Sequence, residues 1–325
     1  MLIAERTLSV DLADYIRVRA VCSAWRRCTE DPHADARGGA LDKRFHPRQW
    51  IMLDDSVGGV RPHHSRFLNV STGKCVRMEL PELQDHVVLA LTPEGLLLLL
   101  KDDETHTICL LNPLTGARTD LPPATALLSS YKPDHFFPRS PSEAEALAVY
   151  GVGIAHDLTV VVNFSKHRQL AVARPSDKHW TRLRCEKDRT HGPILSFAGR
   201  VYCVVCKTIM VVETSPDNHL PRLTEVATIM GPRPSDNRLD TLHLVDNGGE
   251  LLVVHRIPCL AFIRFNAYTI NNKAYGVDLE AGTSTSVDKG DLGGRKLFIG
   301  MRRSLSVSAA LSLFITGDLV CARLD

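Results

Sequence analysis

The sequence has no excess of one charge, few aromatic residues and no long hydrophobic run. Its 325 residues include 39 Lys and Arg against 37 Asp and Glu, a net charge of +2, and aromatic residues make up 6%. A balanced charge does not predict nucleic-acid binding, which needs a concentrated basic face. The most apolar stretch, from Val87 to Leu100, is short and is interrupted at Pro93, so it does not predict a membrane span.

A disulfide framework and a secretory leader are also not expected. The nine cysteines are an odd number and are irregularly spaced, which favours the reducing cytoplasm or nucleus. Glu5 and Arg6 place charge where a signal peptide needs an apolar core. With 44% apolar residues, a chain of this length can bury a core without cross-links.

The first 30 residues predict a helical segment, with one helix between Ser9 and Arg27. Ser9 or Asp11 is the expected cap, and Asp14 falls in the favoured first turn. Two adjacent apolar stripes follow helical spacing: Tyr15, Val18, Val21, Cys22 and Trp25, and beside them Leu12, Ile16, Ala20 and Ala24. Because such a short helix is only marginally stable alone, both stripes are expected to pack against other residues. These residues belong to this chain or, for part of the apolar face, to another chain.

A linker is expected at residues 31–48 and a mainly β domain at 49–325. Pro32 and the pair Gly38-Gly39 stop a helix at the start of the linker. After it come short runs of strand length, rich in Val, Ile and Leu and separated by turn residues. The runs are Leu96–Leu100, Thr107–Leu111, Thr159–Phe164, Leu170–Ala173, Arg200–Cys206, Thr208–Val212, Leu251–His255, Ala261–Phe265 and Lys296–Ile299.

A repeat of about 50 residues predicts the architecture of the β domain. Glycine precedes a strong apolar strand at Gly95, Gly151, Gly199, Gly249 and Gly300, at intervals of 48 to 56 residues. This period matches the blade of a kelch-like β-propeller, in which each blade is a four-stranded antiparallel sheet, and the domain has room for about five or six blades. A pair of β-sandwiches remains the structural alternative.

Several segments resemble a known family. Residues 14–26, which contain Val21-Cys22 followed by Trp25-Arg26, look like the second half of an F-box. Residues 66–74, 110–118 (with the turn Asn-Pro-Leu-Thr-Gly) and 305–309 are similar to plant F-box proteins that carry a C-terminal KIB-type β-propeller. The resemblance covers nearly the whole chain.

This resemblance implies a substrate receptor and not an enzyme. The F-box would dock onto the Skp-type adaptor of a cullin-based ubiquitin ligase, and the propeller would hold an unknown target protein. No cofactor, nucleic acid or membrane is implied, and the expected location is the cytoplasm or the nucleus. The expected adaptor-binding residues are Leu12, Tyr15, Val18, Val21, Cys22 and Trp25.

Two other functions stay open beside the receptor. Residues 1–8 match only the later part of the first F-box helix, so the chain could be a propeller scaffold that no longer binds the adaptor. A propeller hydrolase would need an acid–base or metal cluster on several strand ends, which the sequence does not indicate. At the other end, residues 312–316 and 319–322 are expected to form a closing hairpin around Gly317-Asp318.

Motifs that suggest chemistry have simpler interpretations. Cys203 and Cys206 form a C-x-x-C pair inside an expected strand, where positions three apart face opposite sides, so no metal site is expected. His63-His64 lies in a polar loop and predicts solvated imidazoles. Lys101 to Glu104 predicts a hairpin tip and not a catalytic carboxylate pair. The expected loops of the propeller rim are residues 131–141 and 231–240.

Overall fold

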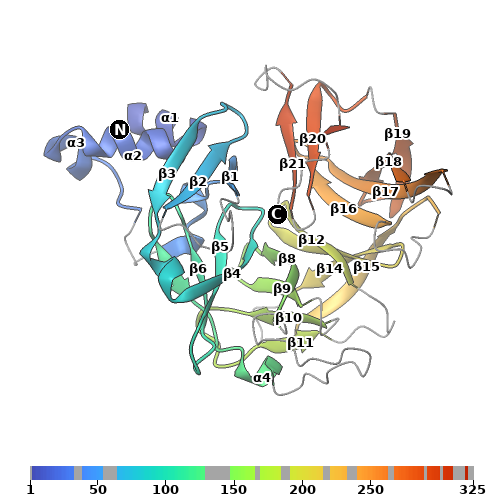
Figure 1. Cartoon of the computed structure of the whole chain (residues 1–325), viewed down its shortest axis with the longest axis horizontal. Coiled ribbons are helices and arrows are strands. Elements are labelled where there is room, and N and C mark those ends of the chain that lie inside the picture. The colour runs from blue at the N-terminus through green and yellow to red at the C-terminus, as the bar shows by residue number, and fades with distance from the viewer. Residues whose placement is uncertain are drawn as a thin grey trace. The chain divides into compact units, whose positions relative to one another are not determined.

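The computed structural model describes most of the chain as short strands with a few small helices (Figure 1). Contacts divide it into two compact units, Met1–Ala146 with Ala173–Trp180, and Leu147–Val172 with Thr181–Asp325. The description covers residues 2–32, 39–53, 64–128, 147–164, 169–183, 191–214, 220–232, 240–262, 267–288, 291–300, 303–309 and 319–320. None of the described helices is long and apolar enough to cross a membrane.

The first unit begins with three helices, and the range from Ser9 to Arg27, where one helix was expected, holds the end of the first helix and the other two. They are α1 (Leu2–Val10), α2 (Leu12–Ala20) and α3 (Ser23–Arg27). The breaks fall at Asp11 and Cys22, which are both in extended conformation and accept hydrogen bonds from Ala13 N and Trp25 N, respectively. Asp11 is therefore a cap, as expected, but its extended backbone also ends α1. The apolar stripes run from Leu12 to Trp25 and continue across the break at Cys22, so helical spacing alone did not reveal that break.

Residues 39–48, expected to be part of a linker, pack against the first unit. Gly39–Leu41 and Lys43–Phe45 form 3-10 turns η2 and η3, and Ala40, Leu41 and Phe45 are at most 2% exposed. The Ala40 amide donates to Thr119 Oγ1 at 3.0 Å. This part of the chain therefore joins the helices to the β-structure as packed chain; residues 33–38 lie outside the described part.

Two antiparallel sheets complete the first unit. The first has the order β1-β2-β3, formed by Trp50–Leu53, His64–Asn69 and Cys75–Glu79. The second has the order β4-β5-β6-β7, formed by His86–Leu91, Leu97–Lys101, Ile108–Leu111 and Arg118–Asp120. A 3-10 turn, η4 (Pro81–Gln84), joins them, and a short helix, α4 (Thr125–Leu128), follows β7.

The same turn occurs once in each of these two sheets. Asn69 begins the β2–β3 turn and Asn112 begins the β6–β7 turn. Each asparagine carbonyl accepts from the glycine four residues later at 2.8 Å, and each side-chain Oδ1 accepts from the amides two and three residues later. The Asn-Pro-Leu-Thr-Gly motif of the family resemblance is therefore a turn between the last two strands of a sheet.

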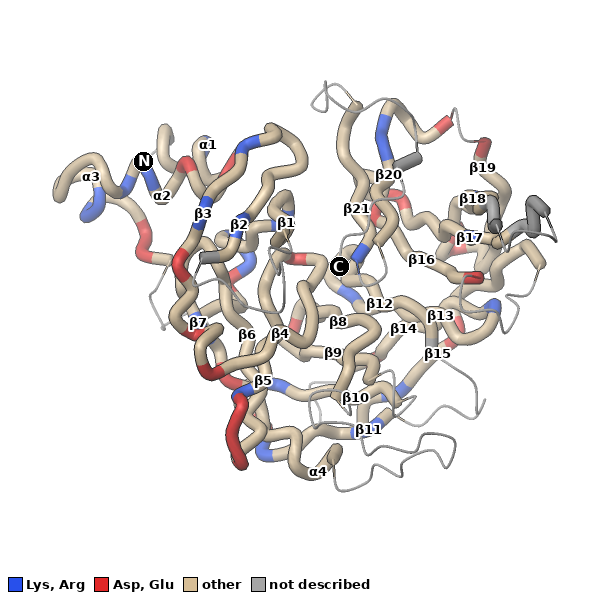
Figure 2. Tube along the Cα trace, in the orientation of Figure 1, with Lys and Arg blue, Asp and Glu red and all other residues tan. Residues whose placement is uncertain are grey.

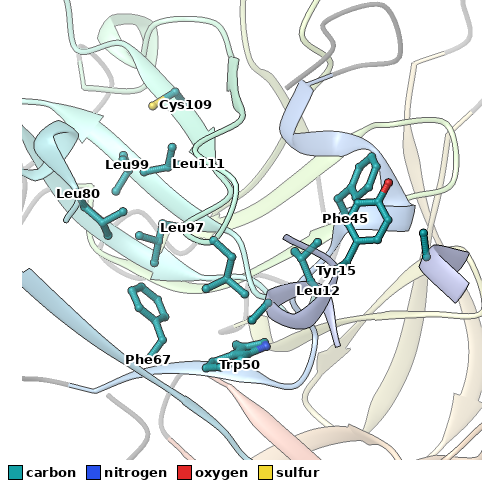
Figure 3. Close-up of a cluster of buried hydrophobic side chains, with 13 residues drawn as sticks. Leu12, Tyr15, Phe45, Trp50, Phe67, Leu80, Leu97, Leu99, Cys109 and Leu111 are labelled. Carbon is teal, nitrogen blue, oxygen red and sulfur yellow. The ribbon is translucent and has the colours of Figure 1, made fainter. Parts of the chain in front are cut away.

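The core of the first unit includes the helices (Figure 3). Leu12 and Tyr15 of α2 lie in one buried cluster with Phe45, Trp50 and Leu97. The Asp11 carboxylate, which is 4% exposed, also accepts from Trp50 Nε1 at 3.1 Å and from Asn69 Nδ2 at 3.3 Å. The helical segment is therefore built onto the first two sheets and has no separate core.

The second unit contains three four-stranded antiparallel sheets, each in sequence order. They are β8–β11 (Val149–Ile154, Val160–Phe164, Gln169–Ala173, Thr181–Leu183), β12–β15 (His191–Phe197, Arg200–Val205, Thr208–Glu213, Arg222–Thr228) and β16–β19 (Thr241–Asp246, Leu251–Phe262, Ala267–Asp278, Thr283–Val287). A repeated four-stranded meander is the blade that the 50-residue period predicts.

The last sheet departs from this pattern. Its order is β21-β20-β22, from Ser304–Ser308, Arg295–Ile299 and Leu319–Val320, and β22 pairs with β20 in parallel. The hairpin expected around Gly317-Asp318 would need residues 312–316, which lie outside the described part. The second of its expected strands is present in part, as β22.

The glycine repeat is right for four hairpins and wrong for Gly151. Gly95, Gly199, Gly249 and Gly300 lie in the turn between two adjacent strands. Gly151 instead lies within β8, where an added Cβ would come 3.1 Å from Ile194 N of β12. The equivalent turn in the β8–β11 sheet uses Leu158 in the left-handed region, at φ 66°. Gly151 therefore serves close approach of two strands and not a turn.

Candidate functional site

The six residues expected to bind an adaptor divide into buried and exposed sets. Leu12 and Tyr15 are 5% and 3% exposed, and Val18 is half-buried. Val21, Cys22 and Trp25 are exposed, with values of 63% for Val21 and 46% for Trp25. The structure thus uses the first two residues to hold α2 on the sheets and leaves the last three for contact with solvent or a partner.

Tyr15 connects the helical segment to the chain that follows it. Its hydroxyl donates to the Glu30 carbonyl at 2.9 Å, and its ring lies 5.8 Å from that of Phe45. Packing between tilted aromatic rings adds to the burial of both. Tyr15 is therefore a structural residue of the segment.

Arg19 fixes the position of α3. It is 8% exposed, and its Nη1 donates to the Thr29 carbonyl at 2.7 Å, to the Glu30 carbonyl at 2.5 Å and, more weakly, to the Arg26 carbonyl at 3.3 Å. Arg26 lies in the last turn of α3 and Thr29 and Glu30 follow it, so one guanidinium donates hydrogen bonds to carbonyl groups at the end of this short helix.

Sequence reasoning missed Arg19, although the signal was present. Arg19 lies four residues after Tyr15 and seven after Leu12, so it belongs to the buried stripe of α2. A cation on an apolar helical stripe indicates a buried hydrogen-bonding role.

The Val21–Trp25 surface, defined by Val21, Cys22 and Trp25, lies at the junction of α2 and α3. Cys22 Sγ accepts from Trp25 N at 3.4 Å, and the Trp25 carbonyl accepts from Thr29 Oγ1 at 2.8 Å. The indole is thus carried by a short turn that is held on both sides. A large aromatic residue presented on a fixed turn is a typical anchor in protein interfaces.

The other sequence candidates do not form a catalytic or metal site in the described part of the chain. No three His, Cys, Asp or Glu side chains come together there as a metal would need. Cys203 is buried in β13, whereas Cys206 lies beyond the strand end with φ 60°. The expected tip begins at Lys101, the last residue of β5, and the residues that follow it, 102–104, form an acidic stretch in Figure 2. There Lys101 Nζ lies 2.7 Å from Asp103 and lowers the pKa of that carboxyl to about 2.

Three expected segments cannot be described in full. Residues 131–141 and His63 lie outside the described residues, and of the rim segment 231–240 only residues 231, 232 and 240 are described. Of His64, the structure describes the backbone in β2.

A family model for the KIB1-4 β-propeller matches residues 67–323, which is most of the chain. The chain belongs to the KIB1-4 β-propeller family. This membership decides between the two architectures that the sequence left open, in favour of the propeller. The KIB1-4 match begins within β2, so the helical segment lies outside it.

No curated protein matches this KIB1-4 chain. Solved structures with a similar arrangement of strands include virginiamycin B lyase from Staphylococcus aureus, at 13% identity and a TM-score of 0.37 over 70% of this chain and 63% of the lyase. YCF48 from Cyanidioschyzon merolae matches at 12% identity and 0.39 over 75% and 76%. The chain spans less than two thirds of the lyase's length, and likeness at this level carries no functional information.

Proposed function

We propose that this KIB1-4 protein is a substrate receptor of a Skp–cullin–F-box ubiquitin ligase. The helices α1–α3 dock the Skp-type adaptor and through it a cullin, and the propeller binds a target protein in the cytoplasm or nucleus. Chemistry belongs to other subunits, so the chain itself needs no cofactor and is not an enzyme. Neither nucleic acid nor membrane is a partner in this proposal.

One observation carries the proposal. The F-box-like motif Val-Cys-x-x-Trp-Arg leaves Val21, Cys22 and Trp25 exposed on a turn that Arg19 and Thr29 hold in place. An exposed apolar surface that includes tryptophan is best explained by a partner.

The scaffold without adaptor binding remains the second candidate because of a specific observation. Leu12 and Tyr15, two of the six expected contact residues, are committed to the core of this chain. A smaller apolar contact area remains for an adaptor, and loss of buried apolar area weakens association.

The decisive experiment is co-expression with a Skp-type adaptor, followed by pull-down and size-exclusion chromatography. The receptor predicts a stable one-to-one complex, and Trp25→Ala should weaken it by at least about 30-fold, as expected for a hot-spot tryptophan worth about 2 kcal/mol or more. Circular dichroism should show unchanged β content, because the indole is not part of the core.

The matched control is Leu220→Ala. Leu220 is 80% exposed but lies in the second unit, away from the helices in sequence. It should bind the adaptor like the wild type. Wild-type protein that folds but leaves the adaptor behind would favour the scaffold, and binding unaffected by Trp25→Ala would rule out the Val21–Trp25 surface as the docking site.

A further inference from the structure

One face of the β16–β19 sheet carries a row of polar side chains. Thr241 of β16, Arg256 of β17 and Asn272 of β18 are direct cross-strand partners. Paired residues of antiparallel strands place their side chains on the same face at close range. His243, two residues after Thr241, shares this face, and its Nε2 lies 2.9 Å from Thr241 Oγ1.

Arg256 has no acid to neutralise it among the described residues. Its register partners, Thr241 and Asn272, are uncharged. Its Nε is buried and makes no hydrogen bond to any described residue. A guanidinium carries five donors and keeps its charge, so leaving part of it desolvated without an acceptor is unfavourable.

The apolar surroundings of Arg256 would strengthen its attraction to a bound anion. On the same face, Val245, Leu252 and Val254 pack with Leu297 and Ile299 of β20. His243 is 3% exposed, and burial together with the Arg256 charge lowers its pKa to about 3, so it stays neutral. Arg256 is thus a positive charge beside an apolar cluster, where electrostatic attraction is less screened than in water.

We propose that Arg256 and Thr241 form a binding site for an oxyanion, a carboxylate or phosphate group. The guanidinium fork would supply two parallel N–H donors, as it does for both groups. If His243 donates its Nε2 proton to Thr241 Oγ1, the threonine hydroxyl proton is free for the anion. Asn272 borders the site from the third strand. This inference does not depend on adaptor docking.

The test is thermal unfolding of the full chain in phosphate, acetate or chloride at matched ionic strength. The wild type should gain Tm with phosphate, acetate or both, relative to chloride. A response to one of them identifies the preferred group, and a response to both supports a general oxyanion site. Phosphate also stabilises proteins non-specifically, so the comparison with variants is what decides.

Arg256→Met is the main variant. In chloride it should be at least as stable as the wild type, because it removes an unneutralised charge from a partly buried position. In the stabilising anion the wild type should become the more stable of the two, since the variant lacks the guanidinium that binds the anion. Arg222→Gln is the matched control, because Arg222 is 75% exposed and paired with Glu213, and it should respond to the anions like the wild type.

Equal responses of wild type and Arg256→Met would overturn the proposal, as would no response of the wild type. If Arg256→Met does not fold, Arg256→Lys replaces it in the test. That variant keeps the charge but lacks the fork, and it should need about tenfold more anion for half of the Tm gain. A wild-type-like titration of Arg256→Lys would contradict a site built on the fork.

Discussion

Two of the buried histidines, one in each compact unit, have pKa values that burial lowers strongly. His46 follows η3 in the first unit and is 9% exposed, and His243 lies in β16 of the second unit. Burial lowers the pKa of His46 to about 4, with a smaller effect from Arg48, and burial lowers that of His243 to about 3. Both imidazoles are therefore neutral in the folded protein at any pH above about 5.

Stability should fall as the pH drops from about 6.5 to about 4. In this window the unfolded chain, with a histidine pKa of about 6.5, binds protons that the folded chain excludes, so acid favours unfolding. Each histidine contributes roughly 3 kcal/mol to the full decrease. Urea unfolding measured at pH 7, 6, 5 and 4 should show this slope in the free energy of unfolding.

The control separates these histidines from the carboxylates. His46→Gln should reduce the slope, whereas His179→Gln, at an exposed position, should leave it unchanged. Carboxyls such as Asp14 and Asp42, whose pKa values are lowered by Lys74 and Arg44, lose their contribution only below about pH 4. A profile that is flat between pH 6.5 and 4 would contradict burial of neutral histidine.

The turns between neighbouring strands depend on left-handed backbone positions. Gly95, Gly199 and Gly249 have φ between 76° and 99°, a region in which other residues are strained. Their surroundings differ. An added Cβ at Gly95 would overlap the Pro47 carbonyl, whereas at Gly249 it would meet no described atom within 4 Å.

Gly95→Ala should therefore be much more harmful than Gly249→Ala. Both variants gain the left-handed strain, about 1–2 kcal/mol, but only the first adds a backbone clash in the core of the first unit. We expect Gly249→Ala to remain folded with a modestly lower Tm. Gly95→Ala should lose at least about 2 kcal/mol more. Equal losses in thermal unfolding would show that Pro47 can move away.

Most strands could be predicted because apolar runs and turn residues are local signals. Leu97, Leu98 and Leu99, for example, are fully buried in β5, and such an uninterrupted run is typical of a strand covered on both faces. The repeat failed at Gly151 because strand packing can require glycine as much as a turn does. The helix break at Cys22 was missed because both stripes continue through it, from Leu12 to Trp25.

The candidate sites likewise combine features that a local sequence pattern predicts with features that depend on the fold. Trp25 was named as a candidate adaptor contact from a motif, but its separation from the buried Tyr15 depends on where α2 contacts the sheets. The row of Thr241, Arg256 and Asn272 spans 31 positions along the chain and is produced by strand register. Register depends on pairing over the whole sheet, so no local pattern predicted it.

In the first unit, the helices and sheets share one core. Removing residues 1–30 would therefore expose Phe45 and Trp50, which contact Tyr15 and Asp11 and are both 2% exposed. We expect the truncated chain to aggregate or to bind a hydrophobic dye during purification. An independent F-box on a tether would instead leave a folded propeller, with thermal unfolding unchanged.

Asp11→Ala is the milder version of this test. It removes an N-cap and leaves Trp50 Nε1 without its buried acceptor, so we expect a loss of about 2–4 kcal/mol. Trp25→Ala, which touches the exposed side, should leave the Tm within a degree or two of wild type. Similar Tm values for all three proteins would mean that the helices do not contribute to the core.

The shared core also limits how far the helices of the proposed receptor can move relative to the first two sheets. In a ligase built on a flexible tether, the distance between target and ubiquitin donor is averaged over many conformations. Here Asp11, the N-cap of α2, accepts hydrogen bonds from two residues of the first sheet. Arg19 of α2 donates a hydrogen bond to the Thr29 carbonyl, just after α3, and so holds α3 in place. An adaptor bound at Trp25 would therefore hold the first two sheets in a fixed orientation relative to itself. Which lysines of a target are modified would then follow from geometry and not from chain length.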